Sequence, residues 1–272
     1  LRRAGARLVG VPVTTEDGWD LDRAEQAFAR TLPVMAYLMP DFQNPTGRSM
    51  AVDEREAMLA AGEQAGSVLV LDETTADLDI ERDPIAPGFT ASEPGTVVRI
   101  GSLGKTVWGG LRLGWVRADG DLIRRLVAAR PAHDLGTPEF EQAIATRLLS
   151  QFDDVVAQRS ELLRSGRDAL VRALRDRLPS WGLPDVRGGV SLWIELGAPL
   201  SSALVIEARS RGVLLSAGPR FSVDGGHERH LRVPFTAPPE EMVRAVDVLA
   251  EAWASVRAGA PSTIVEHVGA VI

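Results

Sequence analysis

The chain has 272 residues, of which 45% are hydrophobic and 25% charged, as in ordinary globular proteins. Its formal net charge of -7 argues against a broad nucleic-acid-binding surface on this segment, and the lack of cysteine excludes disulfides and cysteine-based metal sites. No run of about 18 or more apolar residues occurs, so the sequence predicts no membrane-spanning helix, and a cytoplasmic location is the default expectation.

The first half of the chain alternates short apolar runs with amphipathic helical patterns. Strands are predicted at residues 6–13, 34–40, 67–73 and 96–100, and helices at residues 20–31 and 49–66. Asp20 and Ser49 are the expected helix N-caps, and Gly66 is the expected helix stop. This βαβ rhythm predicts a mostly parallel sheet covered by helices on both faces. Residues 111–118 follow without room for a crossover helix, so they should either pair antiparallel with the preceding strand or bend away from it.

From Thr137 onward the pattern changes to a long helical region followed by an α+β arrangement. Apolar residues recur at three- and four-residue spacing over residues 138–178, which predicts two helices or one bent helix. Further strands and helices are predicted at residues 188–196, 201–212, 213–218, 230–235 and 238–259. We therefore expect a large domain at residues 1–135, connecting helices and a smaller domain at 136–259, and a tail at 260–272.

The opening residues, ARLVGVPV, look like a strand already under way, with no earlier element to pair with and no initiator methionine. This pattern indicates that the chain is part of a longer protein whose N-terminal segment is missing here.

Polar side chains gather just past the carboxyl ends of three predicted strands, where open α/β sheets bind ligands. Asn44, in DFQNPTG, follows the first strand; its amide could donate to a ligand oxygen, and a capping turn explains it equally well. Asp72 ends the second strand, where a helix cap, a metal or a protonated ring nitrogen could pair the carboxylate. The cap is the simpler reading of Asp72 alone. Ser102 and Arg112 follow the third strand and suit an anion, through a hydroxyl and a forked guanidinium.

Lys105 is the only lysine in the chain and lies between Ser102 and Arg112. Most lysines are solvated surface residues, but this chain uses arginine for its other strongly basic side chains, and only lysine can lose its proton at ordinary pH. Val107 and Trp108 flank it, and an apolar, cation-rich pocket favours a neutral amine suited to Schiff-base formation. An imine-forming lysine, an acid, an amide and an anion clamp together match pyridoxal phosphate.

The chain resembles fold-type-I pyridoxal phosphate enzymes of the class I/II aminotransferase group. DFQNPTG is similar to that group's NPTG turn, LDE to its aspartate strand, and SLGKTVWGGLRLGW to its lysine–arginine segment. The resemblance implies an α/β fold, with a mostly parallel sheet flanked by helices and a smaller C-terminal α+β domain. The group's phosphate loop and ring-stacking aromatic residue come from an earlier segment that has no counterpart in this sequence, so either the sequence is truncated or its sheet is completed in another way.

The resemblance also implies a role for each candidate residue. Lys105 would be the catalytic residue and would carry the internal aldimine, and Arg232 would grip the substrate α-carboxylate. Without the resemblance, Arg232 looks like a surface arginine on a strand. Asp72 would keep the ring nitrogen protonated, and Asn44 would donate to the ring hydroxyl oxygen. The implied cofactor-binding residues are Asn44, Asp72, Thr74, Ser102, Lys105 and Arg112, with Ser102 and Arg112 holding the phosphate.

The sequence departs from this group after the aspartate. Many members place a tyrosine two or three residues beyond it, where the hydroxyl donates to the ring oxygen. Here Thr74 and Thr75 occupy those positions, and the only tyrosine is Tyr37. Threonine is shorter and less acidic than tyrosine, so the electronics of the cofactor should differ.

More narrowly, the chain is similar to the aminotransferase-like domain of MocR-type regulators, which join it to a GntR-like winged helix-turn-helix. Three functions are considered. In the first, the chain is the effector-sensing part of such a regulator, and DNA is bound only through a missing N-terminal domain. In the second it is a free-standing aminotransferase, and in the third it is a structural domain without cofactor. The first two imply pyridoxal phosphate, a small amino-group substrate or effector, and a homodimer.

Overall fold

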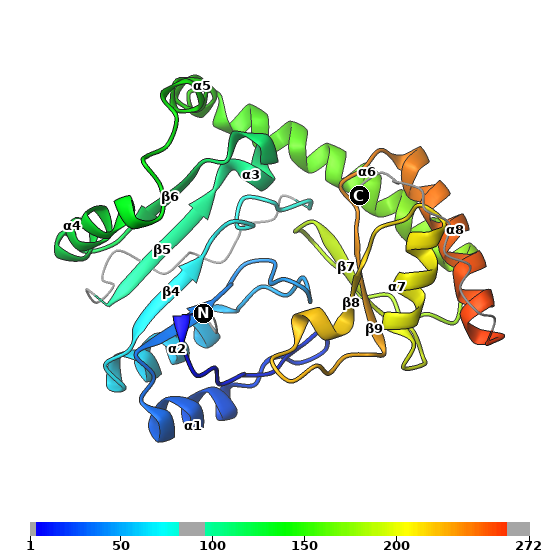
Figure 1. The fold of residues 1–272 in the computed structure, drawn as a ribbon, viewed down its shortest axis with the longest axis horizontal. Helices are drawn as coiled ribbons and strands as arrows, with labels where there is room; N and C mark the ends of the chain where they lie inside the picture. The colour runs from blue at the N-terminus through cyan, green and yellow to red at the C-terminus, as the bar shows by residue number, and fades with distance from the viewer. Residues whose placement is uncertain (1–3, 82–95, 260–272) are drawn as a thin grey trace.

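The computed structural model describes residues 4–81 and 96–259, and the predicted tail at 260–272 lies outside them. Figure 1 shows two regions, one built on the sheet that contains β4, β5 and β6 and one in which α6, α7 and α8 lie beside a second sheet. Among the helices that the structure describes, none is long and apolar enough to cross a membrane.

The N-terminal region is built on a four-stranded sheet in the order β3-β4-β5-β6. Its elements are β1 (Val13–Thr14), β2 (Gly18–Trp19), α1 (Leu21–Thr31), β3 (Met35–Leu38), α2 (Val52–Gln64), β4 (Val68–Asp72), β5 (Val97–Ser102), α3 (Leu103–Thr106), η2 (Gly109–Leu111), β6 (Gly114–Arg117), α4 (Gly120–Ala129) and η3 (Arg130–Ala132). Strands β3, β4 and β5 are parallel, as predicted, and β6 pairs antiparallel with β5, the first of the two expected arrangements. The carboxyl ends of three parallel strands therefore share one edge of the sheet.

The C-terminal region pairs long helices with an antiparallel sheet in the order β7-β9-β8. Its elements are α5 (Glu139–Leu149), α6 (Phe152–Arg177), β7 (Ser191–Glu195), α7 (Ser201–Ser210), β8 (Ser216–Ala217), η4 (Gly218–Phe221), β9 (His230–Pro234) and α8 (Pro239–Arg257). The segment 138–178 forms two helices, which was one of the two predicted outcomes.

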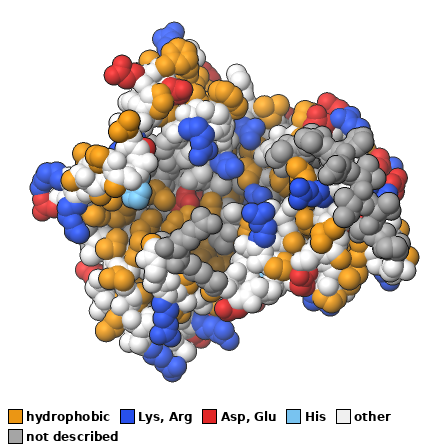
Figure 2. Space-filling model, viewed as in Figure 1, with side chains coloured by type: hydrophobic (Ala, Val, Ile, Leu, Met, Phe, Trp, Pro, Cys, Tyr) orange, Lys and Arg blue, Asp and Glu red, His pale blue; other side chains and the backbone are white. Residues whose placement is uncertain are grey.

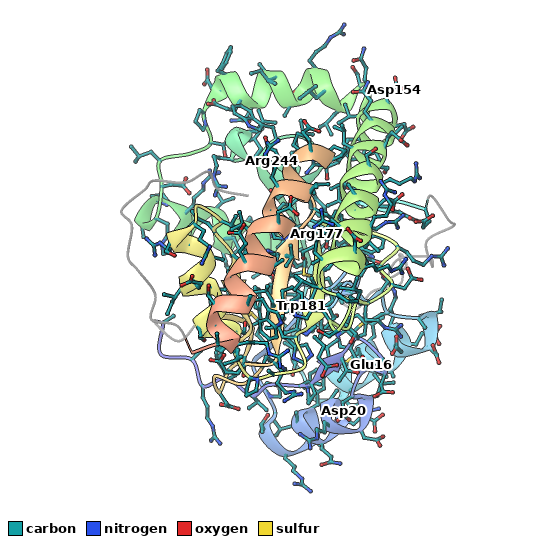
Figure 3. The ribbon with its side chains drawn as sticks, turned by 90° about the vertical axis from the view of Figure 1, so that its right-hand side faces the viewer. Glu16, Asp20, Asp154, Arg177, Trp181 and Arg244 are labelled. Carbon is teal, nitrogen blue, oxygen red and sulfur yellow. The ribbon has the colours of Figure 1, made fainter. Side chains whose placement is uncertain are left out.

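The largest apolar cluster lies in the C-terminal region. Leu170 of α6, Leu231 of β9 and Leu249 of α8 are fully buried in it. Helices α6 and α8 lie side by side in Figure 3, and Arg177 of α6 forms a 3.0 Å ion pair with Asp247 of α8. Because the buried leucines come from both helices and from the sheet, the cluster holds this region together.

A smaller apolar cluster lies under the N-terminal sheet. Phe28 of α1 and Met58 of α2 pack there against Leu69 and Leu71 of β4. Leu78 and Ile80, from the chain just after β4, are buried in the C-terminal cluster instead. The segment after β4 therefore ties the two regions together.

The two faces of the N-terminal sheet differ in cover. Alternation along the strands sends Leu69 and Leu71 toward α1 and α2 and sends Met35, Tyr37 and Val116 to the opposite face. Those three side chains are 38%, 52% and 48% exposed. Figure 2 shows hydrophobic side chains on the part of the surface occupied by this region. The sequence predicted helices on both faces of this sheet, but within the described residues helices cover only one face.

Two local predictions near the N-terminus are wrong, and one helix after β6 was missed. Of residues 6–13 only Val13 is in a strand, in a two-residue pairing with β2, because no longer strand lies alongside this segment in the described residues. Ser49 does not cap α2; its Oγ accepts a hydrogen bond from the backbone of Phe42, and Glu54 bonds the N–H of Ala51 at the helix start. Helix α4 was not predicted, although Asp119 caps it.

The other predicted helix ends are confirmed. The Asp20 carboxylate accepts a 3.0 Å hydrogen bond from the N–H of Arg23 at the start of α1. Gly66 follows α2 with a φ of 65°, a conformation that glycine adopts without strain.

Candidate cofactor-binding site

Asp72 ends β4 at the edge where the parallel strands finish. It is opposite Ile100 of β5, two residues before Ser102. Its Oδ1 accepts a 2.9 Å hydrogen bond from the N–H of Thr74, and its Oδ2 accepts one from the hydroxyl of Tyr37. The carboxylate thus closes the turn after β4. Each of its oxygens can accept two hydrogen bonds, so both keep room for a further donor.

A cavity of about 460 Å³ lies beside β3 and receives two of the predicted cofactor residues. Asn44 and Asp72 both line it, together with Tyr37 and Gln43 and with apolar side chains from α1 and the segment before β1. The backbone N–H of Asn44 donates to Sδ of Met39 at 3.2 Å, which holds the DFQNPTG turn against the end of β3. The cavity therefore combines an amide, a carboxylate and apolar walls.

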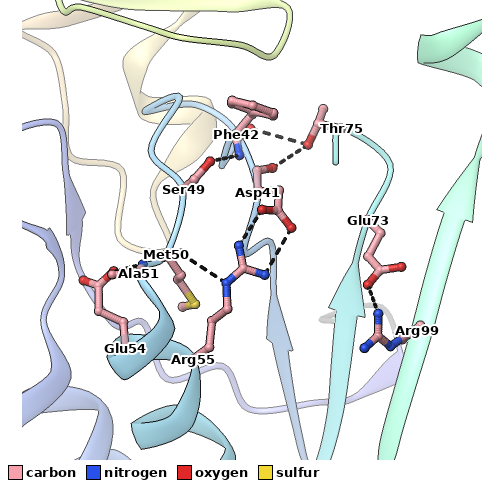
Figure 4. A network of polar contacts seen from close by, with 10 residues as sticks. All are labelled: Asp41, Phe42, Ser49, Met50, Ala51, Glu54, Arg55, Glu73, Thr75 and Arg99. Carbon is pink, nitrogen blue, oxygen red and sulfur yellow. Dashed lines mark hydrogen bonds and ion pairs between the residues drawn. The ribbon is translucent and has the colours of Figure 1, made fainter. Parts of the chain in front are cut away.

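A buried polar network holds the same turn from the other side (Figure 4). Arg55 of α2 forms a 2.5 Å ion pair with Asp41, and its Nε donates to the carbonyl of Met50 at 3.1 Å. The hydroxyl of Thr75 donates to the carbonyl of Asp41 at 2.7 Å. Thr75 is buried in this network, and Thr74 contributes a backbone N–H to Asp72. The sequence analysis did not single out Asp41 or Arg55.

Ser102 and Lys105 lie where β5 runs into the single-turn helix α3. The Ser102 hydroxyl caps α3, accepting from the N–H of Gly104 at 3.0 Å and donating to the carbonyl of Leu113 at 3.1 Å. Its proton is therefore directed to a backbone carbonyl. The carbonyl of Lys105 accepts a 3.1 Å hydrogen bond from Nε of Arg159 on α6, which links α3 to the C-terminal region.

The apolar pocket expected around Lys105 is not found. The side chain of Lys105 is exposed, and so is that of Trp108. Arg112 is also exposed, in a left-handed backbone conformation with a φ of 51°. The reason is local: α3 and the turn after it lie at the strand ends beside the sheet face whose side chains are exposed. The lysine and arginine are therefore accessible to a ligand.

Arg232 lies at the centre of β9, between Trp193 of β7 and Ser216 of β8. Its guanidinium carbon is 5.9 Å from the ring centroid of Phe221, a cation–π distance. Its buried Nε has no hydrogen-bond partner in the described residues, and burial lowers the pKa of the guanidinium. A buried donor without a partner is costly, which favours an acceptor supplied by a ligand. His230, two residues earlier, stacks on Trp193 at 5.1 Å.

Sequence reasoning missed Tyr37 as a site residue, although the alternation rule contained the signal. Tyr37 is in register with Val70, and Asp72 follows two residues later on the same face of the sheet. Pairing β3 with β4 in the predicted sheet would have placed Tyr37 and Asp72 next to each other.

Comparison with known proteins explains this arrangement. The sequence model of the family described as aminotransferase class I and II matches residues 1–249. The chain belongs to this family. The structure superposes on the α-aminoadipate aminotransferase LysN of Thermus thermophilus, in complex with N-(5'-phosphopyridoxyl)-L-leucine, with a TM-score of 0.86 and 29% identity over 93% of this chain and 67% of that one. The fold-type-I architecture inferred from the sequence is confirmed.

Relatives of two kinds match the chain. It is 31% identical to a 2-aminoadipate transaminase of Thermus thermophilus over 88% of its length, and 30% identical to an aromatic-amino-acid aminotransferase of Thermococcus litoralis over 77%. It is also 30% identical, over 82%, to the uncharacterised helix-turn-helix transcriptional regulator YdfD of Bacillus subtilis. The chain spans 62%, 51% and 47% of the lengths of these three proteins.

The family's cofactor is pyridoxal phosphate, and the residues of the cavity fit it. Asp72 keeps acceptor positions for a protonated ring nitrogen, and Asn44 lines the same cavity with an amide donor. Lys105 is exposed at the neighbouring strand end, where its amine is accessible. The donor set therefore suits a pyridinium ring with an aldehyde.

Proposed function

We propose that this chain is a pyridoxal phosphate-binding aminotransferase-like domain and the effector-sensing part of a MocR/GntR-type bacterial transcriptional regulator. The cavity that joins Asn44 and Asp72 beside the carboxyl end of β3 is the observation that carries the cofactor assignment. The similarity to YdfD supports the regulatory role.

Each residue then has a specific task. Lys105 holds the cofactor covalently through Nζ, and Asp72 keeps the ring nitrogen protonated. Asn44 donates its amide to the ring hydroxyl oxygen. When bound, the cofactor supplies an electron sink for the Cα–H bond of an amino acid. Arg232 binds the α-carboxylate, because its buried Nε lacks a partner and its guanidinium is held against Phe221.

The phosphate is assigned to Ser102 and Arg112. Arg112 is exposed and offers a forked guanidinium. Ser102 can contribute if its hydroxyl proton turns from the carbonyl of Leu113 to the ligand, since a hydroxyl rotates freely between acceptors. Thr74 contributes through its N–H to Asp72, which makes it a support for the ring-binding acid.

We also propose that the protein acts as a homodimer in the cytoplasm, with residues 1–135 as the large domain and 136–259 as the connecting helices and small domain. Large apolar side chains are exposed between β6 and α6: Leu126, Val127, Leu135, Phe140 and Leu149. A group of exposed apolar side chains of this kind favours burial against a second copy.

Cofactor binding is tested by adding pyridoxal phosphate to the full-length protein and recording its visible absorbance. We expect a band that persists after desalting, and Lys105→Ala should abolish it because Lys105 is the proposed attachment point and the only lysine among these 272 residues. A persistent band of equal intensity in the Lys105→Ala variant would refute the assignment of Lys105.

The alternative is a free-standing aminotransferase, which the two similar transaminases support. Both functions use the same residues, so substitutions at these residues do not separate them. A half-reaction with an amino acid does. Bleaching of the band by an amino acid with formation of one equivalent of the matching 2-oxo acid would establish turnover. A spectral change without 2-oxo acid, together with amino-acid-dependent DNA binding by the full-length protein, would establish sensing.

A further inference from the structure

Tyr37 is the only tyrosine in the chain, and its hydroxyl donates a hydrogen bond to Oδ2 of Asp72. The contact joins two neighbouring parallel strands, because Tyr37 is opposite Val70 and shares a sheet face with Asp72. Both side chains line the cavity that also receives Asn44. The tyrosine therefore lies inside the candidate site, although its sequence position is far from the aspartate.

The Asp72 carboxylate is held from two sides. The N–H of Thr74 fixes Oδ1 at 2.9 Å, and Tyr37 fixes Oδ2. Since each oxygen accepts two hydrogen bonds, the carboxylate still has a position for a ring N–H.

We propose that Tyr37 is a positioning residue for Asp72: the Tyr37 hydroxyl holds the Asp72 carboxylate turned toward the ring nitrogen of the cofactor. The identity of that ring rests on the proposed function. In many family members a tyrosine after the aspartate donates to the ring oxygen; here the single tyrosine lies on the adjacent strand and donates to the acid itself. Asp72, rather than the ring oxygen, receives the tyrosine hydrogen bond in this chain.

The hydroxyl is suited to this task because it keeps its proton. Burial and the hydrogen bond and charge of Asp72 raise the pKa of Tyr37 well above its ordinary value. A phenol that remains protonated through the neutral range is a permanent donor. The orientation of Asp72 should therefore not vary with pH near neutrality.

The contact is tested first on the cofactor-free protein, by ultraviolet titration of tyrosinate absorbance. The difference between the protein and its Tyr37→Phe variant isolates this residue, and circular dichroism verifies that the fold persists over the pH range used. We expect Tyr37 to stay protonated beyond about pH 10, where ordinary tyrosines ionise. Asp72→Asn should lower the midpoint by about one pH unit. An identical midpoint in the Asp72→Asn variant would overturn the proposal.

The second test uses the protein with bound cofactor. Tyr37→Phe removes only the hydroxyl, and Val116→Ile, on the same sheet face but outside the cavity, is the control. We expect Tyr37→Phe to raise the dissociation constant for pyridoxal phosphate about two- to tenfold and to weaken the induced circular dichroism of the bound cofactor. Val116→Ile should match the unmodified protein, and so would Tyr37→Phe if the proposal were wrong. If no variant binds cofactor, the proposed function fails, while the titration still decides the Tyr37–Asp72 contact.

Discussion

The two regions of the molecule are held together by different means. In the C-terminal region, α6 and α8 pack on the antiparallel sheet around leucines that are fully buried. In the N-terminal region one sheet face packs on α1 and α2, and the other carries exposed side chains. The turn that carries Asn44 is secured by a buried polar network centred on Arg55. The C-terminal region thus owes its shape to apolar packing, and the candidate site owes its shape to polar contacts.

The difference separates stability from chemistry. Apolar burial is non-directional and tolerates small shifts, whereas hydrogen bonds and ion pairs fix particular atoms in particular directions. A cofactor site needs the second kind of restraint, because its acid and amide must meet defined ring atoms. We therefore expect the two regions to respond differently to matched substitutions.

The largest effect is expected from breaking the buried pair in the N-terminal region. Arg55→Leu leaves Asp41, which is 5% exposed, without its ion-pair partner. Such a loss costs about 3–5 kcal/mol, measured as the free energy of unfolding by chemical denaturation. Arg124→Leu is the control, because its partner Asp121 and Arg124 itself are exposed, and it should cost less than about 1 kcal/mol. Equal losses would show that the polar network does not secure the turn.

The second prediction compares the loss of stability caused by the same substitution in each of the two sheets. Val233 of β9 is 3% exposed, whereas Val116 of β6 lies on the exposed face of the N-terminal sheet. Val233→Ala should destabilise the protein by about 2 kcal/mol, from two lost methyl groups and the cavity they leave. Val116→Ala should cost well under half as much. Denaturation curves of the two variants test this, and similar midpoints would mean that the β6 face is covered in solution.

The same contrast explains what the sequence could predict. The parallel order of β3, β4 and β5 and the antiparallel β6 follow from apolar periodicity and connection length, both of which are local. Asn44, Asp72 and Ser102 were found because strand ends are marked in the sequence by a change from apolar to polar residues.

The contacts between elements could not be predicted in the same way. The Arg55–Asp41 pair and the Tyr37–Asp72 hydrogen bond each join residues from different elements, and they depend on register and side-chain direction. The exposure of Lys105 also depends on what lies beside α3, which its apolar sequence neighbours do not reveal. Local sequence patterns thus predicted which residues lie at the strand ends. Tertiary packing determines which partners each of them contacts.

The smallest effect concerns the C-terminal region and pH. His230 stacks on Trp193, and its buried Nδ1 has no hydrogen-bond partner in the described residues. Burial is the main cause that lowers the pKa of His230; His227 and Arg229 lower it further, and Glu195 and Glu16 oppose the shift. The folded protein therefore holds this histidine neutral at pH values where the unfolded chain has begun to protonate it.

The sign of the pH effect follows from proton binding. Below the ordinary histidine pKa of about 6.5 the unfolded chain binds more protons at this position than the folded protein does, so stability falls as the pH drops from there toward the lowered pKa of His230. His230→Gln should flatten this loss when unfolding free energies are compared at pH 7 and pH 5. His133→Gln, at an exposed position, should leave the loss unchanged. If His230→Gln kept the full pH dependence, the loss would have to come from other groups, and packing against Trp193 would be the only role left for His230.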